Sequence, residues 1–131
     1  MEDRQNTKSE LFKKRLYNFT LKLIKLIESL PNDNVSRRMG DQLLRSGTSV
    51  IANYIEGKAA SSKKDFANFI NISLKSSNES KLWISLLKDS GKLNPETSEW
   101  FLNELKEISN IFGASLVTLR KAGGKNERDK S

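Results

Sequence analysis

The residues best suited to chemistry lie between Gln42 and Gly57, where short polar side chains recur at helical spacing. They are Gln42, Ser46, Ser49, Asn53 and Glu56, which follow one another at steps of four, three, four and three positions. Arg45 borders this set. This spacing places them on one face of a helix. The polar face has two interpretations: it faces water, or it contacts another helix or subunit through hydrogen bonds that fix the register. Hydroxyls and amides in place of lysines favour the contact.

Basic residues form the second candidate set. The chain has 131 residues with 23 Lys+Arg against 16 Asp+Glu, a formal charge of +7 at pH 7. We predict that the clustered cations bind nucleic-acid phosphates; they are Lys13, Lys14, Arg15, Lys22, Lys25, Arg37, Arg38, Lys63 and Lys64. The alternative is ordinary solubilising charge, which suffices for a monomer. An oligomer would multiply the patch into a field that a polynucleotide feels strongly.

Catalytic machinery is missing from the sequence. The chain has no histidine and no cysteine, which excludes imidazole bases, thiol nucleophiles, disulfides and zinc–thiolate sites. Carboxylates do pair on the last apolar segment, at Glu104 and Glu107, but we expect them to face water beside Lys106. We therefore predict a protein that is not an enzyme, with no catalytic residue, no metal and no cofactor.

Three breaks divide the chain into the elements that must position these residues. Turn-forming residues cluster at Pro31, at residues 57–62 and at Pro95. Between the breaks, apolar residues recur at spacings of three and four, which predicts helices. The resulting fold is an all-α, antiparallel, up-down four-helix bundle. We expect a flexible N-terminus over 1–6, the bundle over 7–121 and a disordered basic tail over 122–131.

Local signals predict how the helices begin, end and pack. Asn34 or Ser36 would cap the second helix, Ser62 the third, and Gly91 would follow the third helix in the left-handed region. The fourth helix would begin near Pro95 or Ser98. In an up-down bundle, Lys13, Lys14 and Arg15 would lie near Lys63 and Lys64. Two glycines in the second helix, Gly40 and Gly47, suggest close approach of a neighbouring helix.

Aromatic residues offer little for nucleic-acid readout. The ten aromatic residues lie mostly on apolar stripes. We therefore expect no exposed platform on which bases could stack.

An ordered set of motifs resembles the signature of a bacterial four-helix-bundle family, the one named for the ribosomal RNA intervening-sequence protein. The set is Gln42-Leu43, Arg45-Ser46, Ser49-Val50, Asn53, Ile55-Glu56-Gly57, Ser62, Asp65-Phe66, Phe69 and Ile72. Residues 76–80, followed by Trp83 and Leu86-Leu87, resemble one variant of the family's third helix. The resemblance covers about residues 11–119. Tyr54-Ile55 departs from the Ile-Ala of many members, and residues 58–60 lack the basic residue that many members place before the serine.

The resemblance implies an assembly and a set of partners. Family members form antiparallel bundles, and related proteins assemble as rings of five, so the chain is expected to form a homopentamer. Some members are encoded within insertions in large-subunit ribosomal RNA genes. A relative is the accessory protein of diversity-generating retroelements, which works with a reverse transcriptase and its RNA. No catalytic residue is assigned to the family.

Two functional hypotheses follow. The first is a non-enzymatic oligomeric bundle that binds structured RNA or DNA through its basic patches. The alternative is a protein-interaction scaffold, such as an accessory subunit for a reverse transcriptase or another partner. The polar start of the chain and the absence of long apolar runs predict a cytoplasmic protein without a signal peptide or membrane contact.

Overall fold

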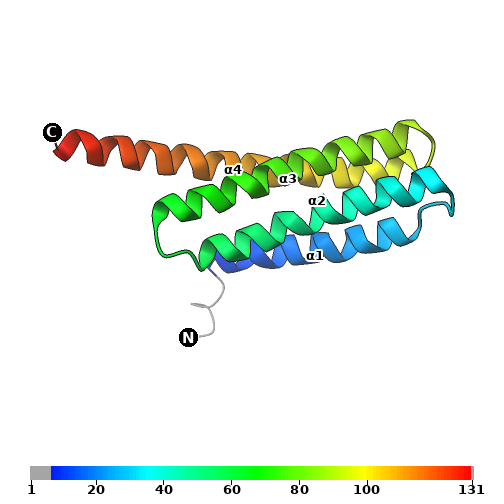
Figure 1. Ribbon diagram of the computed structural model, residues 1–131, viewed down its shortest axis with the longest axis horizontal. Coiled ribbons are helices and arrows are strands. Elements are labelled where there is room, and N and C mark those ends of the chain that lie inside the picture. Colours follow the sequence, from blue (N-terminus) through cyan, green and yellow to red (C-terminus); the bar gives the residue numbers. More distant parts are fainter. Residues whose placement is uncertain (1–6, 131) are drawn as a thin grey trace.

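The computed structural model describes residues 7–130, with side chains described for 7–122, and the predicted flexible residues 1–6 lie outside this range. Four helices make up the fold: α1 (Lys8–Glu28), α2 (Asn34–Lys58), α3 (Lys63–Asp89) and α4 (Pro95–Lys130). They run alternately up and down and are joined by short turns (Figure 1). No strand occurs over residues 7–130. The predicted all-α antiparallel four-helix bundle is confirmed.

Side-chain caps explain where three helices begin. Thr7 accepts a hydrogen bond from the N–H of Glu10, and Ser62 accepts one from the N–H of Asp65, as predicted for α3. The cap of α2 is Asp33, and the prediction of Asn34 or Ser36 was wrong. One Asp33 oxygen accepts from the Ser36 N–H at 2.8 Å and the other from the Ser36 hydroxyl at 2.9 Å. Asp33 serves both donors because it lies three residues before Ser36.

The turn between α3 and α4 follows the predicted glycine. Gly91 has φ +79°, a region that favours glycine. The N–H of Lys92 donates to the Leu87 carbonyl at 2.8 Å and the N–H of Gly91 donates to the Lys88 carbonyl at 3.0 Å. This pair of bonds is a Schellman motif, which satisfies the last carbonyls of α3. Asn94 then caps α4, its side-chain oxygen accepting from the N–H of Glu96 at 2.8 Å.

The end of the chain differs from the expectation of a disordered tail over 122–131. Helix α4 continues to Lys130 and projects beyond the α2–α3 turn (Figure 1). Extending an existing helix adds one hydrogen bond for each residue fixed, whereas starting a helix is costly. Continuation therefore tolerates two adjacent glycines that would disfavour a new helix. Ser131 and the side chains after residue 122 lie outside the described part of the chain.

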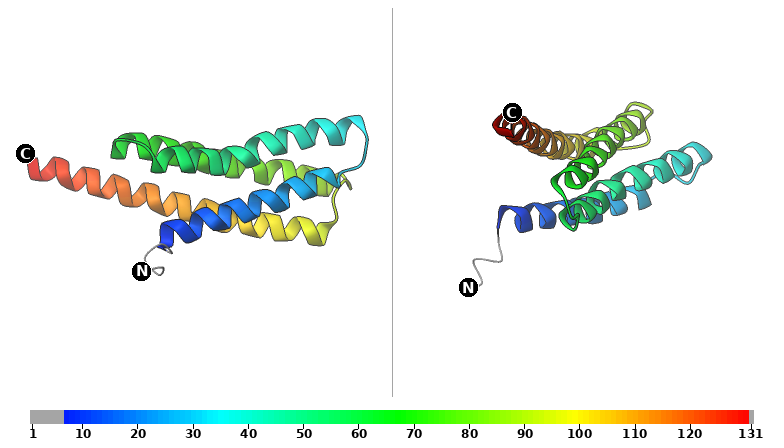
Figure 2. Two further views of the ribbon diagram at one scale, coloured as in Figure 1. Left: turned by 90° about the horizontal axis from the view of Figure 1, so that it is seen from below. Right: turned by 60° about the vertical axis from the view of Figure 1, so that its left-hand side comes forward.

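Aromatic rings pack between α1 and α4, which cross each other in the left view of Figure 2. Phe12 packs edge-to-face on Phe112 at 5.4 Å between ring centroids, and Phe19 packs on Phe101 at 5.7 Å. Tyr54, the departure from the family pattern, is buried and packs on Phe12 at 5.2 Å. Its hydroxyl lies 3.0 Å from that of Ser9, so the bulky residue fastens the start of α1 to the end of α2.

Gly40 and Gly47 of α2 face α1, which confirms the predicted close approach of a neighbouring helix. A Cβ atom added at Gly40 would lie 3.1 Å from Cδ1 of Leu30. One added at Gly47 would overlap Cδ2 of Leu23, a fully buried core residue. The absence of side chains at these two positions lets the leucines of α1 reach the backbone of α2.

Gly47→Ala tests this packing, with Gly113→Ala as the matched control. We expect the Gly47 substitution to lower the free energy of unfolding by about 1–3 kcal/mol, because the new methyl group overpacks the core against Leu23. At Gly113 nothing lies within 4 Å of an added Cβ. There alanine should raise stability by about 0.5–1 kcal/mol through helix propensity. Urea unfolding of both variants measures the difference, and equal effects would refute the close approach.

Candidate nucleic-acid interface

The middle of the polar face of α2 forms hydrogen bonds inside the bundle. Ser46 and Ser80 share a hydrogen bond of 2.8 Å between their hydroxyls. Farther along, the Ser76 hydroxyl donates to the Ser49 hydroxyl, also at 2.8 Å. The Asn53 amide donates back to the Ser49 hydroxyl at 2.9 Å. The middle of the predicted face therefore contacts α3, a helix of the same chain.

These bonds belong to a longer row of hydroxyl contacts, which we call the serine ladder. The Ser73 hydroxyl donates to the Val50 carbonyl at 2.9 Å, and the hydroxyls of Ser77 and Ser109 share a hydrogen bond of 2.9 Å that reaches α4. The ladder consists of Ser46, Ser49, Ser73, Ser76, Ser77, Ser80 and Ser109. Every buried polar side-chain atom in the described residues has a hydrogen-bond partner.

The remaining members of the polar face are open to solvent. Gln42, Arg45 and Glu56 are exposed, and neither Arg45 nor Glu56 forms an ion pair with a described residue. A subunit contact through these three residues stays a prediction. Sequence reasoning missed the α3 half of the ladder, although serines at 73, 76, 77 and 80 repeat the three-residue step from Ser46 to Ser49.

Arg15 and the two carboxylates of α4 form an ion-pair cluster. The Arg15 guanidinium donates to both oxygens of Glu104, at 2.8 and 2.7 Å, and also contacts Glu107. This bidentate bond raises the pKa of Arg15 and lowers the pKa of Glu104. The expectation that both carboxylates face water was wrong at Glu104, whose side chain is only 16% exposed. The charge of Arg15 is neutralised by these two carboxylates, so Arg15 is not part of the surface available to phosphates.

One end of the bundle gathers lysines from three elements. Lys13 and Lys58 line a hollow of about 210 Å³ between the start of α1 and the end of α2. Lys58 and Lys63 line an adjoining hollow of about 250 Å³ at the α2–α3 turn. We call Lys13, Lys58 and Lys63 the basic end. The up-down topology brings these elements together, whereas Lys58, the residue shared by both hollows, is not among the predicted binding residues. A carboxylate, Glu10, lines the first hollow as well.

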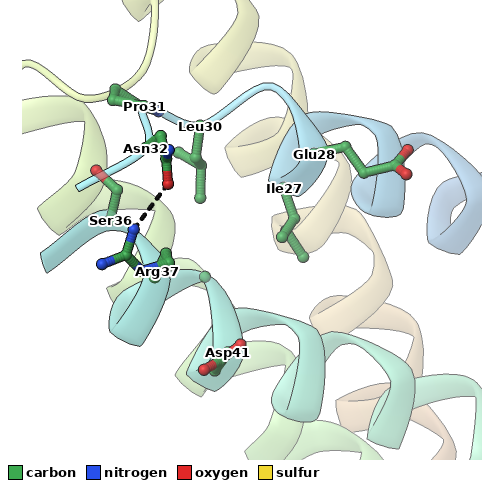
Figure 3. A pocket seen from close by; sticks show the side chains of 9 residues that line it. Ile27, Glu28, Leu30, Pro31, Asn32, Ser36, Arg37 and Asp41 are labelled. Atoms are coloured by element: carbon green, nitrogen blue, oxygen red, sulfur yellow. Dashed lines mark hydrogen bonds between the residues drawn. The ribbon is translucent and has the colours of Figure 1, made fainter. Parts of the chain in front are cut away.

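The opposite end of the bundle carries a pocket of mixed charge. It has a volume of about 420 Å³ beside the turn from α1 to α2, where Arg37 donates to the Asn32 side-chain oxygen at 2.7 Å (Figure 3). Two carboxylates, Glu28 and Asp41, line the same pocket (Figure 3). One guanidinium among two carboxylates favours a phosphate less than the basic end does. Arg38 lies outside the pocket lining, and its side chain donates to Asn34 at 3.2 Å.

An ion pair at this end joins the α1–α2 turn to the α3–α4 turn. Lys92, from the α3–α4 turn, lies 3.1 Å from a carboxylate oxygen of Asp33, the cap of α2. The pKa of Asp33 falls to about 2. The main cause is the hydrogen bond that the carboxylate accepts from the Ser36 N–H, and the second is the hydrogen bond that it accepts from the Lys92 ammonium. Lys92 is therefore another cation whose charge is used within the fold.

Trp100 lies on the surface at the same end. The prediction that the aromatic residues offer no exposed ring was wrong here, because Trp100 is 43% exposed. Its ring borders an apolar groove that Lys22 and Lys25 of α1 also line. The ammonium of Lys22 lies 4.5 Å from the centroid of the Trp100 ring. No sequence pattern marks this residue, because Trp100 follows the same helical spacing as its buried neighbours.

Most of the predicted cations form no ion pair within the described residues. Ion pairs among the described residues use only three cations, Arg15, Lys88 and Lys92. Within the same residues, eight of the nine predicted binding residues form no ion pair: Lys13, Lys14, Lys22, Lys25, Arg37, Arg38, Lys63 and Lys64. Their charge is available to an external anion.

Two other kinds of site receive no support from the described part of the chain. No group of three or more acidic side chains there is placed to hold a metal ion. None of the four helices, as far as they are described, combines the length and apolar character needed to cross a bilayer.

Comparison with known proteins places the fold and these residues in a family. Residues 9–114 match the family described as 23S rRNA-intervening sequence protein. The chain belongs to this family. A crystal structure at 1.70 Å of a protein of unknown function, from the S23 ribosomal protein family of Bacteroides thetaiotaomicron VPI-5482, is similar at 34% identity with a TM-score of 0.75. The similarity covers 79% of this chain and 96% of that one. No curated protein matches significantly.

The serine ladder predicts that small size at Ser80 matters more than its hydroxyl. Ser80→Ala should cost about 1 kcal/mol or less, because the hydroxyl of Ser46 can still donate to the Leu43 carbonyl. Ser80→Leu should cost about 1–3 kcal/mol or more, because the added carbons force α2 and α3 apart. Ser115→Leu is the control, since Ser115 bonds only to the carbonyl four residues earlier, as an isolated helical serine does. Thermal unfolding compares the three variants, and a Ser80→Leu protein as stable as wild type would rule out the close contact.

Proposed function

We propose that this member of the intervening-sequence family is a non-enzymatic, oligomeric bundle that binds structured RNA or DNA through phosphate contacts. One observation carries the proposal: a chain with a charge of +7 leaves eight clustered cations without internal ion pairs in the described residues. Unpaired surface lysines and arginines provide the sequence-independent part of nucleic-acid affinity. The family description, which refers to 23S rRNA, supports RNA as the first ligand to test.

The basic end is the proposed centre of contact. Three elements converge there, so Lys13, Lys58 and Lys63 can reach phosphates from different directions. Side chains of Ser61 and Ser62 lie beside Lys58 and Lys63 in the same hollow and provide hydroxyls for hydrogen bonds to phosphate oxygens. The exposed lysines of α1 extend the positive surface along the bundle.

Assembly would strengthen this field. We propose a homopentameric ring, as the family resemblance implies, located in the cytoplasm. Exposed apolar residues on two helices support an interface between copies: Tyr17, Leu21 and Ile24 on α1, and Ile72, Leu82 and Leu86 on α3. Apolar patches on a surface commonly mark such contacts. Light scattering at micromolar concentration is expected to give a multiple of the 14.9 kDa chain mass, and a monomer would reject the assembly.

A protein-interaction scaffold is the second candidate function. The same exposed apolar residues on α1 and α3 could contact a protein partner. The resemblance to the accessory protein of diversity-generating retroelements suggests a reverse transcriptase as that partner. Purification that recovers RNA without a protein partner would count against this alternative.

Neutralising the basic end should weaken RNA binding. We expect the triple variant Lys13→Gln, Lys58→Gln and Lys63→Gln to lose about tenfold or more in affinity for a structured RNA, because each substitution removes a phosphate contact. The control variant carries three substitutions of the same kind at Lys75, Lys81 and Lys106, which lie along α3 and α4 away from the basic end. Filter binding at low salt measures both affinities.

The outcomes separate a local surface from overall charge. Equal losses in the two triple variants would show that net charge alone attracts RNA and would reject the basic end as the contact. Absence of binding by the wild-type protein to structured RNA and DNA at low salt would reject the proposed function.

A further inference from the structure

The groove beside Trp100 combines an apolar lining with two cations, and we call it the Trp100 groove. It has a volume of about 540 Å³ and lies between the second half of α1 and the first turns of α4. Its apolar lining includes Leu26 and Phe101, both nearly fully buried, and the exposed ring of Trp100. Lys22 and Lys25 line the side formed by α1. The groove is therefore amphipathic, with a flat aromatic surface beside two ammonium groups.

The Trp100 ring is held in place before any ligand arrives. It packs edge-to-face on Phe101 at 4.8 Å between centroids, and it lies nearly parallel to Phe19, at 20° and 6.4 Å. These contacts restrict the ring while 43% of the residue stays exposed. A ring fixed by its neighbours loses little conformational freedom when a second ring stacks on it.

The charge around the groove favours an anion. No carboxylate lines it. The charge of Lys22 helps to lower the pKa of the Glu104 carboxyl, but Glu104 is already bound to Arg15. Lys22 lies over the Trp100 ring without forming an ion pair with a described residue, and its long side chain can swing from the ring to a phosphate.

We infer that the Trp100 groove binds an unpaired nucleobase, which stacks on Trp100 while Lys22 and Lys25 contact the adjacent phosphates. This inference rests on the proposed nucleic-acid function and adds single-stranded segments to its ligands. A nucleotide joins a planar ring to an anion, which is the combination that the groove offers. An acidic peptide offers anions but seldom a ring beside them, and a lipid headgroup offers no planar surface.

Fluorescence of Trp100 in a Trp83→Phe background isolates the groove, because the chain has only two tryptophans. The probes are a ten-nucleotide single-stranded RNA, an abasic strand with the same number of phosphates, and a blunt RNA duplex. We expect the single-stranded RNA to quench Trp100 and the abasic strand to bind more weakly without the same quenching. Trp100→Ala should weaken binding of single-stranded RNA by about 5- to 150-fold, the range for loss of one stacking contact. Its affinity for the duplex should change less than about twofold.

Two further variants keep the test decisive if Trp100→Ala fails to fold. Trp100→Phe retains a ring and should keep most of the affinity, whereas Lys22→Gln with Lys25→Gln should reduce binding of both the RNA and the abasic strand. Equal quenching by the RNA and the abasic strand would overturn the inference, as would stronger quenching by a glutamate-rich peptide than by the RNA. A change of less than about twofold in the affinity of Trp100→Ala for single-stranded RNA, with duplex binding intact, would overturn the groove alone, whereas no binding to any nucleic acid would reject the proposed function itself.

Discussion

The close contact between α2 and α3 is the constraint on which the rest of the bundle depends. Serine hydroxyls pair directly across this interface, as at Ser46 with Ser80 and at Ser49 with Ser76. Such short side chains can bond only where two helix backbones approach closely. Gly57 reinforces the contact, since a Cβ added there would lie 3.1 Å from Cβ of Phe69. The pair α1 and α4 is different, because large aromatic rings fill the space between these helices.

This division of packing has a consequence for charge. Hydroxyl bonds and apolar contacts join the helices, and ion pairs in the described residues occupy only three cations. Cohesion of the chain therefore leaves most of its lysines unused. The wide spacing of α1 and α4 also leaves Trp100 partly exposed beside two of those lysines. The lysines and the Trp100 ring that are proposed to bind nucleic acid are thus groups that the internal packing leaves exposed.

The sequence predicted the bundle well because its signals are local. Helical periodicity, the breaks at the two prolines and the Ser62 cap act within a few residues, and Gly40 and Gly47 signalled close packing by their lack of a side chain. Predictions that required a partner fared less well. Glu104 looked solvated because Arg15, its partner, lies 89 residues away in the chain. Trp100 looked buried because spacing identifies a face of a helix but not how far the neighbouring helix covers it.

Salt dependence tests most directly whether cohesion and binding use separate interactions. The measurement compares urea unfolding with RNA affinity over the range from about 50 to 200 mM salt. Because few charges hold the fold together, the free energy of unfolding should change by less than about 1 kcal/mol. The logarithm of RNA affinity should fall linearly with the logarithm of salt concentration. The slope should be about −0.9 for each duplex phosphate contacted. An RNA affinity independent of salt would contradict the account, as would a loss of fold stability that parallels the loss of binding.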